Sequence, residues 1–315
     1  MTKRVLVCGG TGFVGSFLVP MLRARHYDVL VLSRRREAPP RLAAVGARML
    51  VGDLLSPTST VLDVGRIDAI ILLAAPRLFG KRLGNRRFRQ LKAELTAIYV
   101  NALDLARRLD CPIIITGGTA FRTKGDEVAD ESWPLVRFGA TRVGEDIDPL
   151  VQEVVAARTP KVVWMLPGQI YGPGGMFMMM YRMSLKGRSA VFGDGGNCIP
   201  RIHVEDCAAA FLAALDHIET LSTGERFIVA DDVSCTSLEF AERLAELLQA
   251  PRPKPAPTFI VKLILGKRLV ETAMMHCKVS NAKAKRMLGW TLRYPSFREG
   301  LEATVEAIAR GEVTA

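Results

Sequence analysis

The sequence predicts an α/β protein built on a doubly wound parallel sheet, with a smaller carboxyl-terminal substrate lobe. Apolar runs rich in Val, Ile and Leu alternate along the chain with segments of helical spacing, the order that produces this architecture. The runs are continuously apolar, which is typical of parallel strands covered on both faces. The first run leads directly into a glycine-rich turn and a helical segment. Together these observations indicate a Rossmann sheet.

The elements of the first half follow from local composition. Strands are expected where aliphatic and β-branched residues run together, and helices where apolar residues recur every three or four positions. In chain order, strands are expected at 4–7, 29–32, 47–51, 69–73, 112–115 and 161–166, and helices at 13–25, 89–109 and 141–157. Pro20 lies inside the first helix, where it removes a backbone hydrogen bond and is expected to bend the helix.

The pattern changes after residue 166. A stretch rich in glycine and methionine covers 168–180, and prolines at 251–257 suggest a surface crossing. Between them, the same criteria predict helices at 204–218 and 238–249 and a strand at 226–229. We expect the Rossmann domain to cover 1–165, with the chain returning to it around 203–232, and the substrate lobe to cover 166–315.

Composition limits the class of protein. No apolar run approaches the roughly 20 residues that a membrane span needs, and the first strand begins at Arg4, which leaves no room for a signal peptide. We therefore expect a soluble, cytoplasmic protein. Its six cysteines are far apart and have no histidine at ligand spacing, so we expect reduced core thiols and no metal site; they are Cys8, Cys111, Cys198, Cys207, Cys235 and Cys277.

The net charge is +11, and part of it is concentrated in one basic segment, 77–92. This segment is either a solvated loop and helix face or a contact for an anionic substrate, a nucleic acid or an acidic membrane surface. It contains one aromatic residue, Phe88, which offers little for base stacking, so nucleic-acid binding is not expected. A small-molecule substrate is expected, and a homodimer stays open. The basic residues are Arg77, Lys81, Arg82, Arg86, Arg87, Arg89 and Lys92.

Three glycines carry the clearest functional motif. Gly9, Gly12 and Gly15 follow the first strand at intervals of three residues and open the first helix. The first permits a tight turn, the second lets the backbone approach a pyrophosphate, and the third lets helix and strand pack closely. The amino end of the helix then faces the anion with free N–H groups. This context predicts a dinucleotide site.

The end of the second strand predicts NADP as the cofactor. An NAD site places an acidic residue there, to accept from the ribose 2′-hydroxyl. This chain instead has Ser33, Arg34, Arg35 and Arg36, and arginine can bind a 2′-phosphate through paired, charged hydrogen bonds. Asp53 follows the third strand, where the adenine edge is expected. The small residues at 73–76 follow the fourth and can line the adenosine.

Several segments carry a family resemblance. They are 9–15 (Gly-Gly-Thr-Gly-Phe-Val-Gly), Asn101, 167–173 (Pro-Gly-Gln-Ile-Tyr-Gly-Pro), 192–195, 203–206 (His-Val-Glu-Asp), 280–283 and 288–290. The chain resembles the extended and atypical short-chain dehydrogenase/reductases, the NAD-dependent epimerase/dehydratase family. The resemblance implies an active site between the Rossmann domain and the lobe. With it, the predicted cofactor contacts are Gly9, Thr11, Gly12, Phe13, Val14, Gly15, Ser33, Arg34, Arg35, Asp53, Leu54, Leu73, Ala74, Ala75, Thr116, Arg142, Pro167 and Ile170.

The chain departs from this family at its catalytic positions. Such enzymes use a Tyr-x-x-x-Lys pair and a Ser or Thr on the preceding strand, and the tyrosine relays a proton. Here Phe138 is at the tyrosine position, Arg142 at the lysine position and Gly118 at the serine position. A phenyl ring has no exchangeable proton, and arginine is a poor acid or base. Thr119 and Tyr171 are the alternative proton donors, besides water or the substrate itself.

The resemblance also bears on the substrate. Nucleotide-sugar members have a diphosphate-binding arginine at the position of Ile199, and Arg201 lies two residues further on. Together with the methionines at 176 and 178–180, this favours a small, apolar-leaning molecule. The predicted substrate contacts are Gln169, Tyr171, Met176 and His203. Each of the last three has a structural alternative: Tyr171 in the lobe interface, Met176 in the lobe core, and His203 as an anchor of the following helix.

Two functions from different classes remain. The first is an enzyme that uses NADP for reduction, or for epimerase- or lyase-type chemistry, without the usual tyrosine. The second is a non-catalytic NADP-binding sensor or assembly factor, with the basic segment contacting a partner. The enzyme is favoured because the cleft segments keep Gln169, Tyr171 and His203, which a pure binding module does not need.

Overall fold

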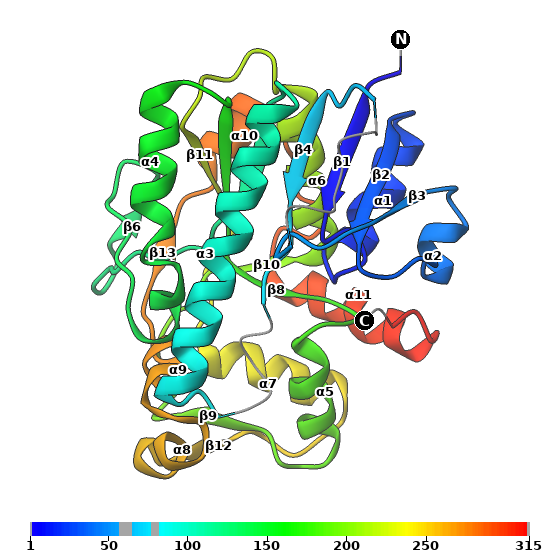
Figure 1. Cartoon of the computed structure of the whole chain (residues 1–315). Coiled ribbons are helices and arrows are strands. Elements are labelled where there is room, and N and C mark those ends of the chain that lie inside the picture. The colour runs from blue at the N-terminus through cyan, green and yellow to red at the C-terminus, as the bar shows by residue number, and fades with distance from the viewer. Residues whose placement is uncertain (1, 57–64, 77–81, 314–315) are drawn as a thin grey trace.

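Seven parallel strands form the centre of the protein, in a computed structural model that describes residues 2–56, 65–76 and 82–313 (Figure 1). Their order across the sheet is β11-β7-β5-β4-β1-β2-β3. The order reverses beside β1, as in a doubly wound Rossmann sheet, so the predicted fold class is confirmed. The strands are β1 (Arg4–Cys8), β2 (Asp28–Ser33), β3 (Arg48–Val51), β4 (Ala69–Leu72), β5 (Ile113–Thr116), β7 (Val162–Pro167) and β11 (Glu225–Val229).

Helices cover both faces of this sheet. On one face, α1 (Gly15–Ala24) and α6 (Val204–Asp216) pack with Val5 and Val7 of β1. On the other, α3 (Asn85–Arg108) and α4 (Ile147–Ala157) pack with Leu6 and Cys8 of the same strand. Successive side chains of a strand point to opposite faces. The strands therefore need apolar residues at every position, which explains their continuous runs.

The remaining elements lie mostly beyond the carboxyl ends of the strands, in the lower part of Figure 1. Two short parallel pairs form there, β8 with β10 and β9 with β12, and a third pair joins β6 to β13. Segment 203–232 returns to the central layer, because α6 packs against α1 and β11 pairs with β7. The elements are α2 (Pro40–Ala43), β6 (Val128–Ala129), β8 (Gln169–Tyr171), α5 (Phe177–Leu185), β9 (Ala190–Phe192), β10 (Arg201–His203), α7 (Ser237–Leu247), β12 (Lys254–Ala256), α8 (Thr258–Leu265), α9 (Lys267–Ala273), β13 (Lys278–Val279), α10 (Ala282–Leu288) and α11 (Phe297–Ala309).

One predicted helix is wrong in its first turn. The segment expected to be α-helical from residue 141 is instead a 3₁₀ helix, η2 (Gly139–Gly144), and α4 begins only at Ile147. Gly139 has φ +54°, and a Cβ on it would lie 2.6 Å from the backbone oxygen of Arg268 in α9. The close approach of α9 fixes this conformation, and a local helical pattern does not reveal such a contact. The other predicted helices and strands form with shifted ends.

The six cysteines are all buried. Cys8 lies in the core on one side of the sheet and Cys207 in the core on the other. Burial raises the pKa of the Cys8 thiol to about 12, so it stays protonated at neutral pH and behaves as a small apolar residue. In the described part of the chain, no helix is long and apolar enough to cross a membrane.

Candidate functional site

The loop after β1 is built around close backbone contacts. Gly9 has φ +92°, and a Cβ on it would lie 2.6 Å from the backbone nitrogen of Ala74. A Cβ on Gly15 would lie 2.5 Å from Cα of Gly10. The N–H of Gly12 donates to the carbonyl of Gly9 at 3.0 Å. Glycine is therefore required at positions 9 and 15 by the fold of the loop itself.

Gly12 is different, because its surroundings are open. It is exposed, and a Cβ built on it would meet only the Gly9 oxygen, at 3.2 Å. It lies just before α1, whose first N–H groups have no partner within the helix. A helix amino end with an open, side-chain-free approach suits an anion such as a pyrophosphate. Thr11, Phe13 and Val14 lie in the same loop and are partly exposed.

The loop after β8 closes against this turn. A Cβ on Gly175 would lie 2.7 Å from a ring carbon of Phe13, and one on Gly172 would lie 3.4 Å from the same ring. Phe13 in turn packs edge-to-face against Phe17 of α1, with ring centroids 6.1 Å apart. The glycine-rich segment after residue 171 therefore contacts the dinucleotide loop directly.

The end of β2 carries the residues expected at a 2′-phosphate. Ser33 is buried, and its Oγ accepts from the backbone N–H of Arg35 at 3.0 Å, which holds the turn. The side chains of Arg34 and Arg35 are exposed. Neither forms an ion pair with a carboxylate among the residues that the structure describes. Both guanidinium groups are thus available to a ligand.

The other predicted cofactor contacts gather along the same edge of the sheet. Asp53 follows β3 and accepts from the N–H of Leu55 at 3.0 Å, while the carbonyl of Leu54 accepts from Asn101. Thr116 ends β5, and its Oγ1 donates to the carbonyl of Leu72 at 2.6 Å. Leu73, Ala74 and Ala75 follow β4, Pro167 ends β7, and Ile170 is the partly buried centre of β8. The structure therefore brings residues from several strand ends together.

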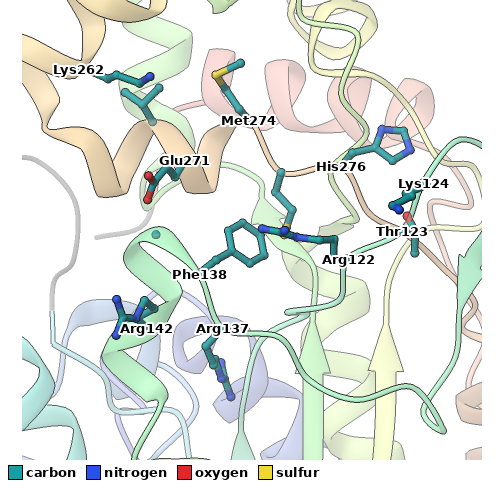
Figure 2. Close-up of a pocket in the computed structure, with 13 residues that line it drawn as sticks. Arg122, Thr123, Lys124, Arg137, Phe138, Arg142, Lys262, Glu271, Met274 and His276 are labelled. Atoms are coloured by element: carbon teal, nitrogen blue, oxygen red, sulfur yellow. The ribbon is translucent and has the colours of Figure 1, made fainter.

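Phe138 and Arg142, the residues that the resemblance places at the usual catalytic pair, lie at η2. Phe138 is partly buried and extended, with φ −149° and ψ 163°, and the guanidinium of Arg122 lies 5.3 Å from its ring centroid. Arg142 is exposed, and its Nε donates to Glu145 at 3.0 Å. In Figure 2 the two side chains point in different directions. A Cβ on Gly118, the predicted serine position, would meet nothing within 4 Å.

A pocket of about 810 Å³ opens beside Phe138 (Figure 2). None of the predicted substrate contacts, Gln169, Tyr171, Met176 and His203, lines it. Its walls come from three other segments of the chain, 122–124, 137–142 and 262–276. Of these residues, the sequence motifs point only to Phe138 and Arg142. The lining residues are Arg122, Thr123, Lys124, Arg137, Phe138, Gly139, Arg142, Lys262, Val270, Glu271, Met274, Met275 and His276.

Tyr171 and His203 lie in the interior of the structure. They are 2% and 1% exposed, respectively, and their rings pack edge-to-face at 5.5 Å. Tyr171 donates to Asp231 at 3.1 Å. Nδ1 of His203 accepts from the N–H of Glu205 and caps α6, and burial lowers its pKa to about 3. The pairing of β8 with β10 places both side chains in register on the same inward face.

The remaining predicted proton donor and substrate contacts are Thr119, Gln169 and Met176. Thr119 is 8% exposed, and its backbone N–H donates to the carbonyl of Pro167 at 3.1 Å. Gln169 is partly buried and accepts from Arg201, a buried arginine whose guanidinium lies 3.8 Å from the ring centroid of Phe240. Met176 is partly exposed and precedes α5.

In the basic segment, Arg77 and Lys81 lie outside the described residues. Arg82, Arg86 and Arg89 are exposed, whereas Nζ of Lys92 lies 2.7 Å from Glu145 and 2.9 Å from Asp146. Phe88 is buried beneath the guanidinium of Arg268, at 4.3 Å. This part of the segment therefore supports the packing of α3 against η2 and α9.

The buried Asp231 predicts a pH-dependent stability. Burial, with a smaller contribution from Asp206, raises the pKa of Asp231 to about 8. The folded state thus holds this proton more firmly than the unfolded chain, whose aspartate titrates near pH 4. The resulting stabilisation is complete below about pH 4 and is lost as pH rises through about 8. We therefore compare the melting temperature of Asp231→Asn with that of the wild type at two pH values. The difference, variant minus wild type, should be at least about 2 °C larger at pH 8.5 than at pH 5.

Thermal unfolding at the two pH values checks this expectation. Asp104→Asn is the matched control, because the Asp104 side chain is 39% exposed and pairs with Arg108 on the surface. Equal shifts at both pH values for Asp231→Asn would contradict the argument.

Comparison with known proteins gives one family model, and curated relatives that match over nearly the full length. The family model for the NAD dependent epimerase/dehydratase family matches residues 5–230. Bovine epimerase family protein SDR39U1 is 29% identical, over 97% of this chain and all of that protein. A 3-diazoavenalumate denitrifying reductase from a Streptomyces species is 28% identical, over 95% and 99%.

Solved structures match in the same way. Human epimerase family protein SDR39U1 (isoform 2), solved with NADPH, has a TM-score of 0.76 and 22% identity, covering 96% of this chain and 99% of its own. The UDP-glucose 4-epimerase of Thermus thermophilus, solved with NAD, has a TM-score of 0.80 and 22% identity, covering 99% and 100%. At these identities the structural likeness establishes the fold alone.

Proposed function

Because this chain belongs to the NAD dependent epimerase/dehydratase family, we propose that it is an NADPH-dependent reductase that works without the family's tyrosine relay. The observation that carries the proposal is the open pocket beside Phe138, the residue that the resemblance assigns to the catalytic tyrosine position. A protein that only binds the cofactor has no need of an accessible cavity at this position. A volume of about 810 Å³ is within the usual range for small-molecule sites.

The residues at the edge of the sheet fit NADP. The open backbone at Gly12 and the amino end of α1 would hold the pyrophosphate. Arg34 and Arg35, exposed and without carboxylate partners in the described residues, would hold the 2′-phosphate. The NADPH in the solved human relative supports this choice of cofactor. When bound, NADPH supplies a hydride.

The pocket residues suggest how the remaining chemistry is done. No tyrosine is among the described residues that line it, and Phe138 cannot give a proton. Arg122, Lys124 and Lys262 are exposed, so water reaches the pocket and can deliver the proton. Cationic side chains can stabilise negative charge that develops on a substrate during reduction. This arrangement suits the reduction of an electron-poor double bond. The reductase among the relatives supports reduction as the type of reaction.

The proposal is tested by mixing the protein and NADPH with a panel of enones, ketones and quinones and following the cofactor's absorbance. We expect saturable oxidation with at least one class. Loss of that activity in Gly12→Ala would tie it to the dinucleotide loop. A protein that binds NADPH yet oxidises it with none of these compounds would contradict the reductase.

The alternative is a non-catalytic NADP-binding sensor or assembly factor. It is favoured by one observation: Phe138 and Arg142 replace both members of the catalytic pair. In that case we expect tight NADPH binding with no turnover across the panel, and a ligand-induced change in association with a partner.

Restoring the pair should not create an ordinary dehydrogenase. Phe138→Tyr with Arg142→Lys returns both residue types, but the side chain at position 142 points away from the ring at 138 and pairs with Glu145 (Figure 2). The lysine would then not lower the pKa of the new tyrosine. We expect carbonyl reduction by this double variant to stay within about twofold of the unmodified protein, a difference of about 0.4 kcal/mol. A tenfold gain would show that the geometry of η2 adapts.

A further inference from the structure

We propose that the pocket beside Phe138 recognises an organic anion with an apolar body, so that the substrate carries a carboxylate or phosphate group. The identification of this ligand as the substrate rests on the proposed reductase function. The binding site itself does not, because it is argued from the side chains that line the pocket. This refines the apolar-leaning substrate expected from the sequence.

Two of the basic residues that line the pocket already have partners. Arg137 forms a two-pronged pair with Asp148, with Nε–Oδ2 and Nη2–Oδ1 distances of 2.9 and 2.6 Å. Nε of Arg142 lies 3.0 Å from Glu145. Such pairs neutralise much of the charge that these residues would otherwise present to a ligand.

Three further cations have no such partner. Arg122, Lys124 and Lys262 are exposed, line the pocket and form no ion pair with a described carboxylate. They come from two segments far apart in the chain, and Figure 2 shows them on different sides of the Phe138 ring. Cations gathered around one cavity repel each other, and a bound anion relieves this repulsion.

Few acidic side chains offset these cations. The only carboxylate that lines the pocket among the described residues is Glu271, and it lies 3.6 Å from Nζ of Lys267, outside the pocket lining. His276 adds no charge, since its Nδ1 accepts from the N–H of Cys198 at 3.3 Å and its Nε2 lies 3.0 Å from the carbonyl of Gly125. A ring that accepts at one nitrogen and donates at the other is neutral.

The loop that carries two of the cations is held in place. His276 fixes Gly125, and Oγ1 of Thr123 accepts from the N–H of Lys278 at 3.1 Å. Nζ of Lys278 also lies 2.7 Å from Asp126. These contacts position the backbone at 122 and 124 before any ligand binds, so less ordering is required on binding.

Four of the other lining residues are apolar. Phe138, Val270, Met274 and Met275 contribute aromatic, aliphatic and thioether surface. Methionine side chains adapt to irregular ligands. Because none of the residues from Gly9 to Gly15 lines this pocket, the anion is not the cofactor's pyrophosphate. The combination fits a molecule with an apolar ring or chain and one anionic group.

The test is calorimetry on protein saturated with NADP⁺, with cinnamate, its neutral amide cinnamamide, and phenyl phosphate as probes. We expect at least one of the two anions to bind at least tenfold more tightly than the amide. The tighter anion identifies the head group as carboxylate or phosphate. The advantage over the amide should decrease as salt is added, because exposed charges are screened. No measurable binding of any probe at millimolar concentration would overturn the proposal.

Variants connect the preference to the named cations. Arg122→Gln with Lys124→Gln should reduce the anion's advantage to less than threefold, while cinnamamide affinity stays unchanged. Arg107→Gln with Arg286→Gln removes the same charge from exposed positions outside the pocket and should leave the advantage intact. Equal losses in both double variants would indicate a general effect of net charge and contradict a built site. If the protein prefers the anion but never oxidises NADPH, the proposed anion site stands and the proposed reductase function is rejected.

Discussion

Gly12→Ala is expected to weaken NADPH binding by about 100-fold while leaving the protein folded. A methyl group at this exposed position would meet only the Gly9 oxygen, at 3.2 Å, so the loop itself needs little adjustment. It would nevertheless occupy the surface that a pyrophosphate must approach. Loss of two charge-assisted hydrogen bonds from backbone N–H groups costs about 3 kcal/mol, which corresponds to the stated change in affinity.

Calorimetry with NADPH and thermal unfolding measure the two parts of this prediction. Gly84→Ala is the matched control, because a Cβ there meets nothing within 4 Å and the residue lies outside the dinucleotide loop. Gly15→Ala is unsuitable, since its Cβ would lie 2.5 Å from the Gly10 backbone and would disturb the fold. Unchanged NADPH affinity in a folded Gly12→Ala protein would place the cofactor elsewhere.

Arg34→Ala with Arg35→Ala is expected to abolish the preference for NADPH over NADH. In the unmodified protein we expect this preference to be at least about tenfold, or 1.4 kcal/mol, because both guanidinium groups are exposed at the end of β2. NADH affinity should change little, as NADH lacks the 2′-phosphate. Titrating both cofactors into both proteins gives the result directly.

A control separates a specific contact from net charge. Arg107→Ala with Arg286→Ala removes two exposed arginines elsewhere and should keep the preference. Equal affinity of the unmodified protein for the two cofactors would refute the assignment of Ser33, Arg34 and Arg35 to a 2′-phosphate.

The sheet and the dinucleotide loop could be predicted because their signals are local. Val5 and Leu6 face opposite cores, so burial on both sides is visible as an unbroken apolar run. Glycine is required at positions 9 and 15 by contacts with residues of the same turn and of the adjacent strand end. The spacing of these glycines in the sequence therefore predicts the loop.

The substrate side could not be predicted in the same way. Whether Tyr171 faces a cleft or the core depends on the pairing of β8 with β10, and three-residue strands carry too little pattern to show it. The pocket depends on α9 lying against η2. This contact brings Met274 into the same pocket lining as Phe138, from more than a hundred positions away. No motif records a contact between such distant segments.

The central claim is that NADP occupies the edge of the sheet and serves the pocket beside Phe138, and a crystal structure of the NADP⁺ complex tests it most directly. The account predicts the pyrophosphate against Gly12, the 2′-phosphate against Arg34 and Arg35, and a nicotinamide ring exposed to the pocket that Arg122 and Lys262 line. A nicotinamide ring sealed by protein side chains and cut off from that pocket would contradict it.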